Sequence, residues 1–285
     1  NTIMLEGNTL TQNENYGIFL SSDSYNYEIN SNTISNSDYG IYFNSYIREG
    51  EINNNTIYDC DNSGIYFTNY SNSANEINEN LIYNCSDYGM YIPQHNWDSL
   101  DLFNNTVYNT GYNGFVYTGS YAGSLTAMNN SVSNTGGFYV NAGSGSNNVV
   151  AYNNVWHEDP EQTTYGGGYL PDGAGNLIDI NDNNDVCDDY GNISEEPLYI
   201  DAGNGYFQLE NNSPNIDVGN PEWLDQDNTR SDIGVFPYLQ NVAIMGVSTS
   251  AIDFGTVTVG DTSFVSFTVS SLGTIDLEVN QMLLS

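Results

Sequence analysis

An asparagine recurs along the first half of the chain at nearly constant spacing, each time followed by a small or apolar residue and then an apolar one. The copies are 24, 23, 25, 25, 25 and 24 residues apart, and they begin at Asn8, Asn32, Asn55, Asn80, Asn105, Asn130 and Asn154. A fixed period in this range indicates a solenoid, in which each repeat forms one coil. Because equivalent residues of neighbouring coils then lie above one another, the period predicts columns of like side chains.

Each repeat has the pattern of β-structure. Apolar and polar residues alternate, turn-forming Asn, Asp, Ser and Gly interrupt the alternation, and no apolar stripe has helical spacing. Strands joined by tight turns, with one period per coil, form a parallel β-helix, which we predict over residues 1–157. Its core consists of four inward-facing columns: Ile29, Ile52, Ile77 and Leu102; Leu10, Ile34, Ile57, Ile82, Val107 and Val132; Ile18, Ile41, Ile65, Met90, Phe115 and Phe138; and Leu20, Phe43, Phe67, Ile92, Tyr117 and Val140.

Two recurring residue types are expected to shape the corners of the coil. The repeated asparagine turns a corner, and its side-chain amide is expected to hydrogen-bond to the same amide of the next coil, as in stacked asparagine ladders. A glycine precedes one strand in each repeat, where we expect a positive φ. These glycines are Gly17, Gly40, Gly64, Gly89 and Gly114.

Charge limits the partners of the chain. Its 285 residues carry a formal charge of −34, and its two cations are Arg48 and Arg230. Such a chain cannot neutralise nucleic-acid phosphates or bind an anionic membrane surface, and no apolar run approaches the ~18 residues of a membrane span. An aromatic content of 13% separates it from disordered acidic tails. Cations, neutral glycans and other proteins remain as partners.

The motif N-x-I-x-N-x-x-x-G-I-Y-F, as in residues 32–43, resembles the right-handed parallel β-helix repeat of the pectate-lyase-like superfamily. The resemblance implies a right-handed, all-β solenoid over roughly residues 1–157, and it says much less about activity. The first residues already belong to a repeat and follow no signal peptide. We therefore expect a piece of a longer bacterial protein that is secreted or displayed on the cell surface.

Residues 158–240 lose the period. An acidic stretch, DINDNNDVCDD (179–189), lacks the spacing of an EF-hand and is expected to be a flexible loop. The patterns N-I-S-x-x-P-L-Y, S-P-x-I-D-x-G and D-x-D-x-T-R-x-D-I-G that follow resemble the tail of secreted bacterial β-helix proteins, which continues or caps the helix. Arg230 is expected to pair with a carboxylate of Asp225, Asp227 or Asp232.

Residues 241–285 alternate cleanly between apolar and polar side chains. The run AIDFGTVTVG resembles the opening strands of a Hydin-type immunoglobulin-like domain. Only about half of the ~100 residues of such a sandwich are present. We therefore predict an incomplete, partial β-sandwich-like segment here.

One outward-facing column is acidic: Glu28, Glu51, Glu76 and Asp101. Its carboxylates, with Asn30, Asn53 and Asn78 beside them, supply oxygen ligands of the kind that Ca²⁺ prefers. The alternative is a solvated acidic face whose side chains splay apart. Asp225 and Asp227 form a second candidate cation site, so Ca²⁺ is the one cofactor expected.

Two outward-facing columns are aromatic. One consists of Tyr58, Tyr83 and Tyr108; the other consists of Phe19, Tyr42, Tyr66, Tyr91 and Tyr139 and is interrupted by Val116. Exposed rings in a row suit stacking against sugar rings, which makes these tyrosines candidate glycan-binding residues. Tyrosine also favours exposed strands, where cross-strand pairs contribute roughly 0.2–1 kcal/mol each, so stability alone could explain the columns.

No residue is identified as catalytic. A lyase acting on uronates needs a base and a neutralising cation, and the coils offer only Arg48, whose neighbour Glu49 can pair with it. A glycosidase needs two carboxylates about 5–9.5 Å apart, which an abundance of acids does not establish. Cys60 and Cys85 share one position in adjacent coils and are expected to be free thiols.

These features predict a non-catalytic extracellular β-helix module. It would bind glycans or Ca²⁺, contact other surface proteins, or act as a rigid spacer. The alternative is a polysaccharide lyase or glycoside hydrolase with part of its site outside residues 1–285.

Overall fold

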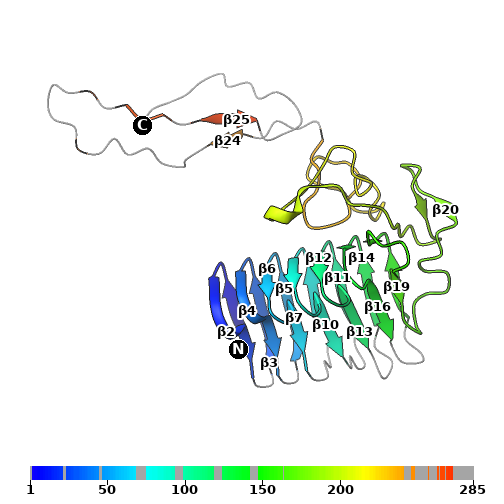
Figure 1. Cartoon of the computed structure of the whole chain (residues 1–285), viewed down its shortest axis with the longest axis horizontal. Coiled ribbons are helices and arrows are strands. Elements are labelled where there is room, and N and C mark those ends of the chain that lie inside the picture. The colour runs from blue at the N-terminus through cyan, green and yellow to red at the C-terminus, as the bar shows by residue number, and fades with distance from the viewer. Residues whose placement is uncertain are drawn as a thin grey trace. The chain divides into compact units, whose positions relative to one another are not determined.

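A computed structural model gives the structure of the chain. It describes residues 2–21, 24–44, 47–68, 75–93, 99–118, 124–141, 147–162, 164–240, 245–247 and 269–271, with isolated positions between 256 and 268. Residues up to 156 form coils whose strands stack along one axis, as Figure 1 shows from the blue to the green strands. The all-β solenoid predicted from the 24-residue period is confirmed.

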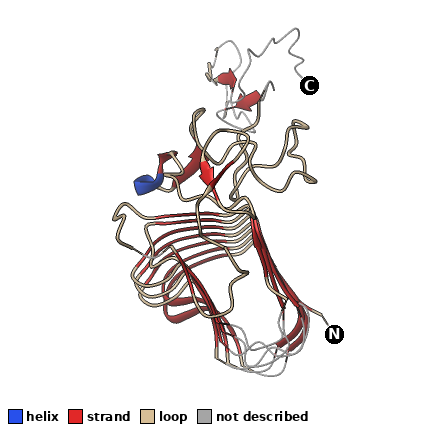
Figure 2. Cartoon of the chain, turned by 90° about the vertical axis from the view of Figure 1, so that its right-hand side faces the viewer, coloured by secondary structure: helices blue, strands red, loops and turns tan. Residues whose placement is uncertain are grey.

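One face of the solenoid is a seven-stranded parallel sheet. Viewed along the coils, its strands superpose (Figure 2). Its order is β1 (Ile3–Glu6), β3 (Ser24–Asn30), β5 (Ile47–Asn53), β8 (Asn75–Asn78), β11 (Ser99–Phe103), β14 (Ser124–Met128) and β17 (Val149–Ala151).

The other two faces belong to one twelve-stranded sheet that divides at β4 (Thr33–Phe43), because the long strands β2 (Thr9–Leu20) and β4 run across both faces. One branch, which we name the tail face, consists of β6 (Thr56–Cys60), β9 (Leu81–Cys85), β12 (Thr106–Thr110), β15 (Ser131–Ser133) and β18 (Asn154–Trp156). The other branch consists of β7 (Ile65–Phe67), β10 (Met90–Pro93), β13 (Phe115–Thr118), β16 (Phe138–Asn141) and β19 (Tyr165–Gly166).

The core lies inside the coils, as the four columns predict. Ile34 pairs with Ile57 and Ile57 with Ile82 in parallel register, and all three side chains are fully buried. The other inward columns are buried in the same way, while Leu10 in the first coil is half-buried. Stacking like residues at the strand spacing of about 4.8 Å removes their apolar surface from water.

An asparagine ladder runs through the corner of each coil and confirms the predicted amide stack. Each side-chain amide donates to the carbonyl oxygen of the next asparagine at 2.9–3.0 Å. The ladder contains Asn8, Asn32, Asn55, Asn80, Asn105, Asn130, Asn153 and Asn192. Two details differ from the prediction: the rung after Asn130 is Asn153 rather than Asn154, and Asn192 adds a further rung.

The positive φ expected at the column glycines is wrong. None of Gly17, Gly40, Gly64, Gly89 and Gly114 has a positive φ. Close packing explains them instead: a Cβ on Gly64 would lie 2.5 Å from a methyl group of Ile82 and 2.8 Å from the carbonyl oxygen of Gly89.

The left-handed conformation belongs to two other columns at the corners, with φ of 51–58°. Asparagine dominates them because it tolerates this region better than other residues with a Cβ. The columns are Ser31, Asn54, Glu79, Asn104 and Asn129, and Asn36, Asp59, Asn84, Asn109 and Asn134.

Residues 158–238 do more than close the end of the solenoid. β22 (Tyr199–Asp201), the short 3-10 helix η1 (Ala202–Asn204) and β23 (Tyr206–Leu209) form an antiparallel unit that places Phe207 against the tail face. Further on, Val235 donates its backbone N–H to Thr106 Oγ1 at 3.0 Å. The tail therefore covers part of one flank of the coils.

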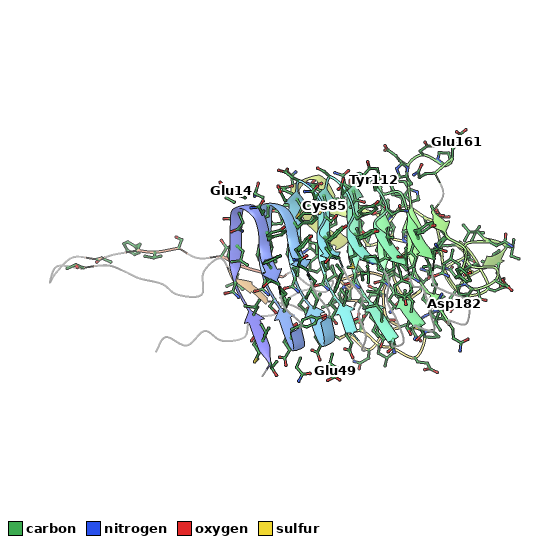
Figure 3. The ribbon with its side chains drawn as sticks, turned by 90° about the horizontal axis from the view of Figure 1, so that it is seen from below. Glu14, Glu49, Cys85, Tyr112, Glu161 and Asp182 are labelled. Carbon is green, nitrogen blue, oxygen red and sulfur yellow. The ribbon has the colours of Figure 1, made fainter. Side chains whose placement is uncertain are left out.

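The acidic stretch 179–189, predicted to be a loop, contains a short hairpin. β20 (Asp179–Ile180) pairs antiparallel with β21 (Val186–Cys187), and Asp182 in its turn accepts a hydrogen bond from Arg230 at 2.7 Å. Arg230 is thus paired with a carboxylate, as expected, but the partner comes from 48 residues away along the chain. Figure 3 shows Asp182 at the far end of the coils from the first strand.

The chain divides into two compact units. The first contains residues 1–223 and 230–238, and the second contains residues 224–229 and 239–285. In the second, β24 (Met245–Val247) pairs antiparallel with β25 (Val269–Ser271), while most of the segment expected to be immunoglobulin-like lies outside the described residues. The predicted boundaries at 157 and 240 stay predictions.

Candidate functional site

A large cluster of aromatic surface side chains lies along the second halves of the long strands β2 and β4 and continues on and beside β7 and β10. We name it the aromatic face, and it consists of Tyr16, Phe19, Tyr39, Tyr42, Tyr66, Tyr88, Tyr91 and Tyr112. Phe19 is 46% and Tyr112 58% exposed, and the other rings are half-buried. Figure 3 shows Tyr112 at the outer margin of the coils.

Its central column stacks face to face. The ring centroids of Tyr42 and Tyr66 are 5.5 Å apart with an interplanar angle of 7°, and those of Tyr66 and Tyr91 are 4.9 Å apart at 15°. Since each ring face lies against its neighbour, these three rings offer a ligand their edges and hydroxyl groups rather than open faces. This geometry changes how the predicted glycan-binding tyrosines could act.

Flanking rings are tilted against that column. Tyr39 makes angles of 64° with Tyr42 and 60° with Tyr66, and Tyr88 makes an angle of 37° with Tyr91. Tilted rings next to a stack create both flat and edge-on aromatic contacts.

A recurring sequence position marks these flanking rings, although the two predicted aromatic columns do not contain Tyr16, Tyr39 or Tyr88. Tyr16, Tyr39 and Tyr88 each stand directly before a column glycine. That glycine is packed closely against the neighbouring coil, so the tyrosine before it recurs at the same corner. Reading the residue before the glycine as a column of its own would have found them.

Burial and mutual proximity raise the pKa of several phenols here. Burial raises the pKa of Tyr66 to about 12, with smaller contributions from Tyr91, Tyr39 and Tyr42. Burial also raises the pKa of Tyr39, Tyr42 and Tyr88, and neighbouring phenols add to each effect. These hydroxyl groups are therefore neutral at physiological pH and can both donate and accept hydrogen bonds.

The second predicted column is largely covered by the tail. Tyr58 and Tyr83 stack at 5.0 Å and 6°, but Tyr83 and Tyr108 also contact Phe207, with ring centroids 5.0 and 5.4 Å from it. Phe207 is itself buried. Only Tyr58 lies beyond these tail contacts, so this column offers no open row of rings.

The acidic column is in the predicted register: Glu28 pairs with Glu51, Glu51 with Glu76, and Glu76 with Asp101. Burial raises the pKa of Asp101, and a hydrogen bond with Thr126 partly opposes the shift.

The asparagines beside this column are already engaged. Asn53 Oδ1 accepts the backbone N–H of Asn78 at 3.1 Å, and Asn53 Nδ2 donates to Glu51 at 3.4 Å. These side chains therefore turn donors toward the acids, while their oxygens, the atoms suited to Ca²⁺, bond the next coil. Calcium binding at the acidic column stays a prediction.

The other residues singled out in the sequence have structural partners. Asp227 accepts hydrogen bonds from the Thr229 backbone and hydroxyl and from the Gln240 N–H; burial acts to raise its pKa, but these bonds outweigh it and lower the pKa. Asp225 N–H donates to Thr229 O within the same turn. The side chain of Arg48 lies outside the described residues.

Cys60 and Cys85 are free and buried in adjacent coils, as expected. The hydrogen bond with the Cys60 thiol and burial raise the pKa of Cys85 well above its usual range, which keeps it protonated and unreactive.

Within the described part of the chain, no three His, Cys, Asp or Glu side chains come together as a group able to hold a metal ion. In the same residues, no helix has the length and apolarity needed to cross a bilayer.

Comparison with known proteins agrees with the coil geometry. Residues 1–156, more than half of the chain, match the family described as "Right handed beta helix region". No curated protein matches the chain. The stacked parallel coils, the asparagine ladder and this match together establish that the chain belongs to the right-handed β-helix family.

Proposed function

We propose that the chain is a secreted or cell-surface β-helix module that binds neutral glycans through its aromatic face and performs no catalysis. The observation that carries the proposal is the continuous set of partly exposed rings from Tyr16 to Tyr112, with stacked and tilted members side by side. Sugars present both flat C–H faces and hydroxyl groups, and this surface has a complement for each.

The rings of the aromatic face differ in orientation and therefore in the contacts that they can make with a sugar. Tilted Tyr39 and Tyr88, with exposed Tyr112, are the rings suited to pack against a sugar face. Tyr42, Tyr66 and Tyr91 contribute edges and a row of hydroxyl groups one coil apart. A ligand with repeating units would meet a repeating surface.

The negative charge of the chain favours the binding of neutral glycans over acidic ones. The chain carries a formal charge of −34, and Asp38 and Asp87 lie close enough to the aromatic face to raise the pKa of Tyr39. A polyuronate would be repelled by this field, whereas a neutral polysaccharide would not. The same shortage of cations disfavours a uronate lyase.

The experiment is retention of the protein on immobilised neutral polysaccharides, compared with polygalacturonate. Tyr39→Ala combined with Tyr88→Ala should lower retention about tenfold or more, since two ring contacts are lost. Tyr58→Ala is the matched control, because it also removes one stacked ring but lies on the tail face. Far-UV circular dichroism verifies that each variant keeps its strands.

Three outcomes would contradict the proposal. The first is that no neutral polysaccharide retains the protein. The second is that the double variant is retained as well as the wild type, in which case the rings serve only to stabilise the strands. The third is release of reducing ends or unsaturated sugars from any polysaccharide, which would show an enzyme.

A further inference from the structure

A second site, distinct from the aromatic face, lies where the tail meets the last coils. A pocket of about 370 Å³ opens there within the first compact unit. Its size is at the low end of the range of about 300–1,000 Å³ that is usual for small-molecule sites. None of its lining residues belongs to the aromatic face.

Two aromatic side chains of the tail face line the pocket. On the tail face, Tyr83 pairs with Tyr108, Tyr108 with Ser133, and Ser133 with Trp156. Tyr108 and Trp156 are therefore two coils apart, roughly 9–10 Å at the spacing of parallel strands, with only a serine between them. Both aromatic side chains line the pocket.

Ser133 also lines the pocket. Its side chain is completely buried, and its hydroxyl hydrogen-bonds with the Tyr199 hydroxyl. The same Tyr199 hydroxyl makes a short bond, 2.7 Å, with Ser131, so Tyr199 holds this wall of the pocket.

The opposite wall is held in a strained shape. Leu198 lines the pocket with φ of 52°, a conformation that is a genuine outlier for a bulky residue. Its carbonyl oxygen accepts the Glu210 N–H at 2.8 Å, which fixes it in place. Backbone strain of this kind is found mostly at ligand sites and active sites.

Carboxylates surround the opening. Glu158, Glu196 and Glu210 line the pocket and are exposed, and no lysine or arginine is among the lining residues. The whole chain has a formal charge of −34. Together with this charge, the three acids favour a positively charged ligand over a neutral one and disfavour an anion. Aromatic rings add to the attraction for a cation.

We propose that this pocket binds a hexopyranose unit that carries a free amino group. The rings of Tyr108 and Trp156 would contact the sugar ring, and the three glutamates would attract the ammonium group. Variants of the aromatic face leave this pocket intact, so the two proposals can be tested separately.

The experiment is calorimetric titration with the β-1,4-linked disaccharide of glucosamine, with cellobiose and digalacturonate as the neutral and anionic comparisons. The amino disaccharide is expected to bind with one-to-one stoichiometry and at least about tenfold more tightly than cellobiose. Trp156→Ala should weaken its binding by about tenfold or more.

Two further variants keep the test independent of folding. Glu158→Gln should weaken the amino disaccharide and leave cellobiose unchanged. Glu161→Gln, which removes the same charge from an exposed residue outside the lining, is the matched control and should change neither.

The proposal is overturned if the amino disaccharide gives no heat of binding, or if Trp156→Ala and Glu158→Gln both bind it like the wild type. Equal affinity for cellobiose would overturn the selectivity for the amino group. Equal affinity for a linear diamine would overturn recognition of the sugar ring and leave a simple cation site.

Discussion

At the scale of single residues, Asp188 determines how the asparagine ladder ends. Each ladder asparagine gives its backbone N–H and its side-chain amide to the Oδ1 of the next one, as Asn153 does with Asn192 at 2.9 and 3.0 Å. Asn192 makes the same two bonds to Asp188 Oδ1, at 2.9 and 3.2 Å. Because a carboxylate only accepts, Asp188 takes the place of the next rung and needs no successor.

Asp188→Ala is therefore expected to destabilise the protein strongly. The change leaves the Asn192 amide, the Asn192 and Tyr190 backbone N–H groups and the Gly175 N–H without their acceptor. Buried donors without partners cost about 1–3 kcal/mol each, so a loss of roughly 3 kcal/mol or more in the free energy of unfolding is expected. Urea denaturation measures it, with the exposed neighbour Asp189→Ala as the control; equal stability of the two variants would refute this role.

At the scale of elements, the glycine column determines how closely neighbouring coils approach. Gly64 begins the turn into β7, and a side chain there would collide with both a methyl group and a backbone carbonyl of the next coil. Because the carbonyl belongs to the strand ladder, it cannot move without breaking hydrogen bonds in both coils.

Gly64→Ala should consequently lower the free energy of unfolding by about 1–3 kcal/mol, the usual cost of overpacking. Gly203→Ala in η1 is the control, because its nearest neighbour would be 3.8 Å away. Thermal unfolding followed by circular dichroism compares the two. A Gly64→Ala protein as stable as the control would show that the coils can separate there at little cost.

The elements also show which parts of the fold were predictable from sequence. Alternation and the period give the inner columns directly, because Ile34, Ile57 and Ile82 repeat with the coil. The period does not reveal that Phe207 covers Tyr83, since the tail has no repeat and this contact joins residues more than a hundred positions apart. For the same reason the pocket at Ser133 could not be predicted, although the serine itself is visible as a gap in the tyrosine column.

At the scale of the whole molecule, the many half-buried and buried phenols link stability to alkaline pH. Burial raises the pKa of Tyr66, Tyr83 and Tyr199 from 10.0 to about 12, and it raises the pKa of Tyr27 and Tyr117 as well. In the unfolded chain these phenols would ionise near 10, so between these values the folded state holds more protons than the unfolded one. Stability is fully present below pH 10 and falls as the pH rises through the folded-state pKa values.

We therefore expect the unfolding temperature to fall between about pH 10 and 12, and the fall to be shallower in Tyr27→Phe. Tyr27 is completely buried in the core and packs against Phe43, with ring centroids 5.2 Å apart. High salt separates this effect from the repulsion of a chain with charge −34, because salt screens surface charges but not the burial of a phenol. If the fall in unfolding temperature at alkaline pH vanishes in high salt, charge repulsion is its cause. If the fall persists in high salt and Tyr27→Phe reduces it, the buried phenols are its cause.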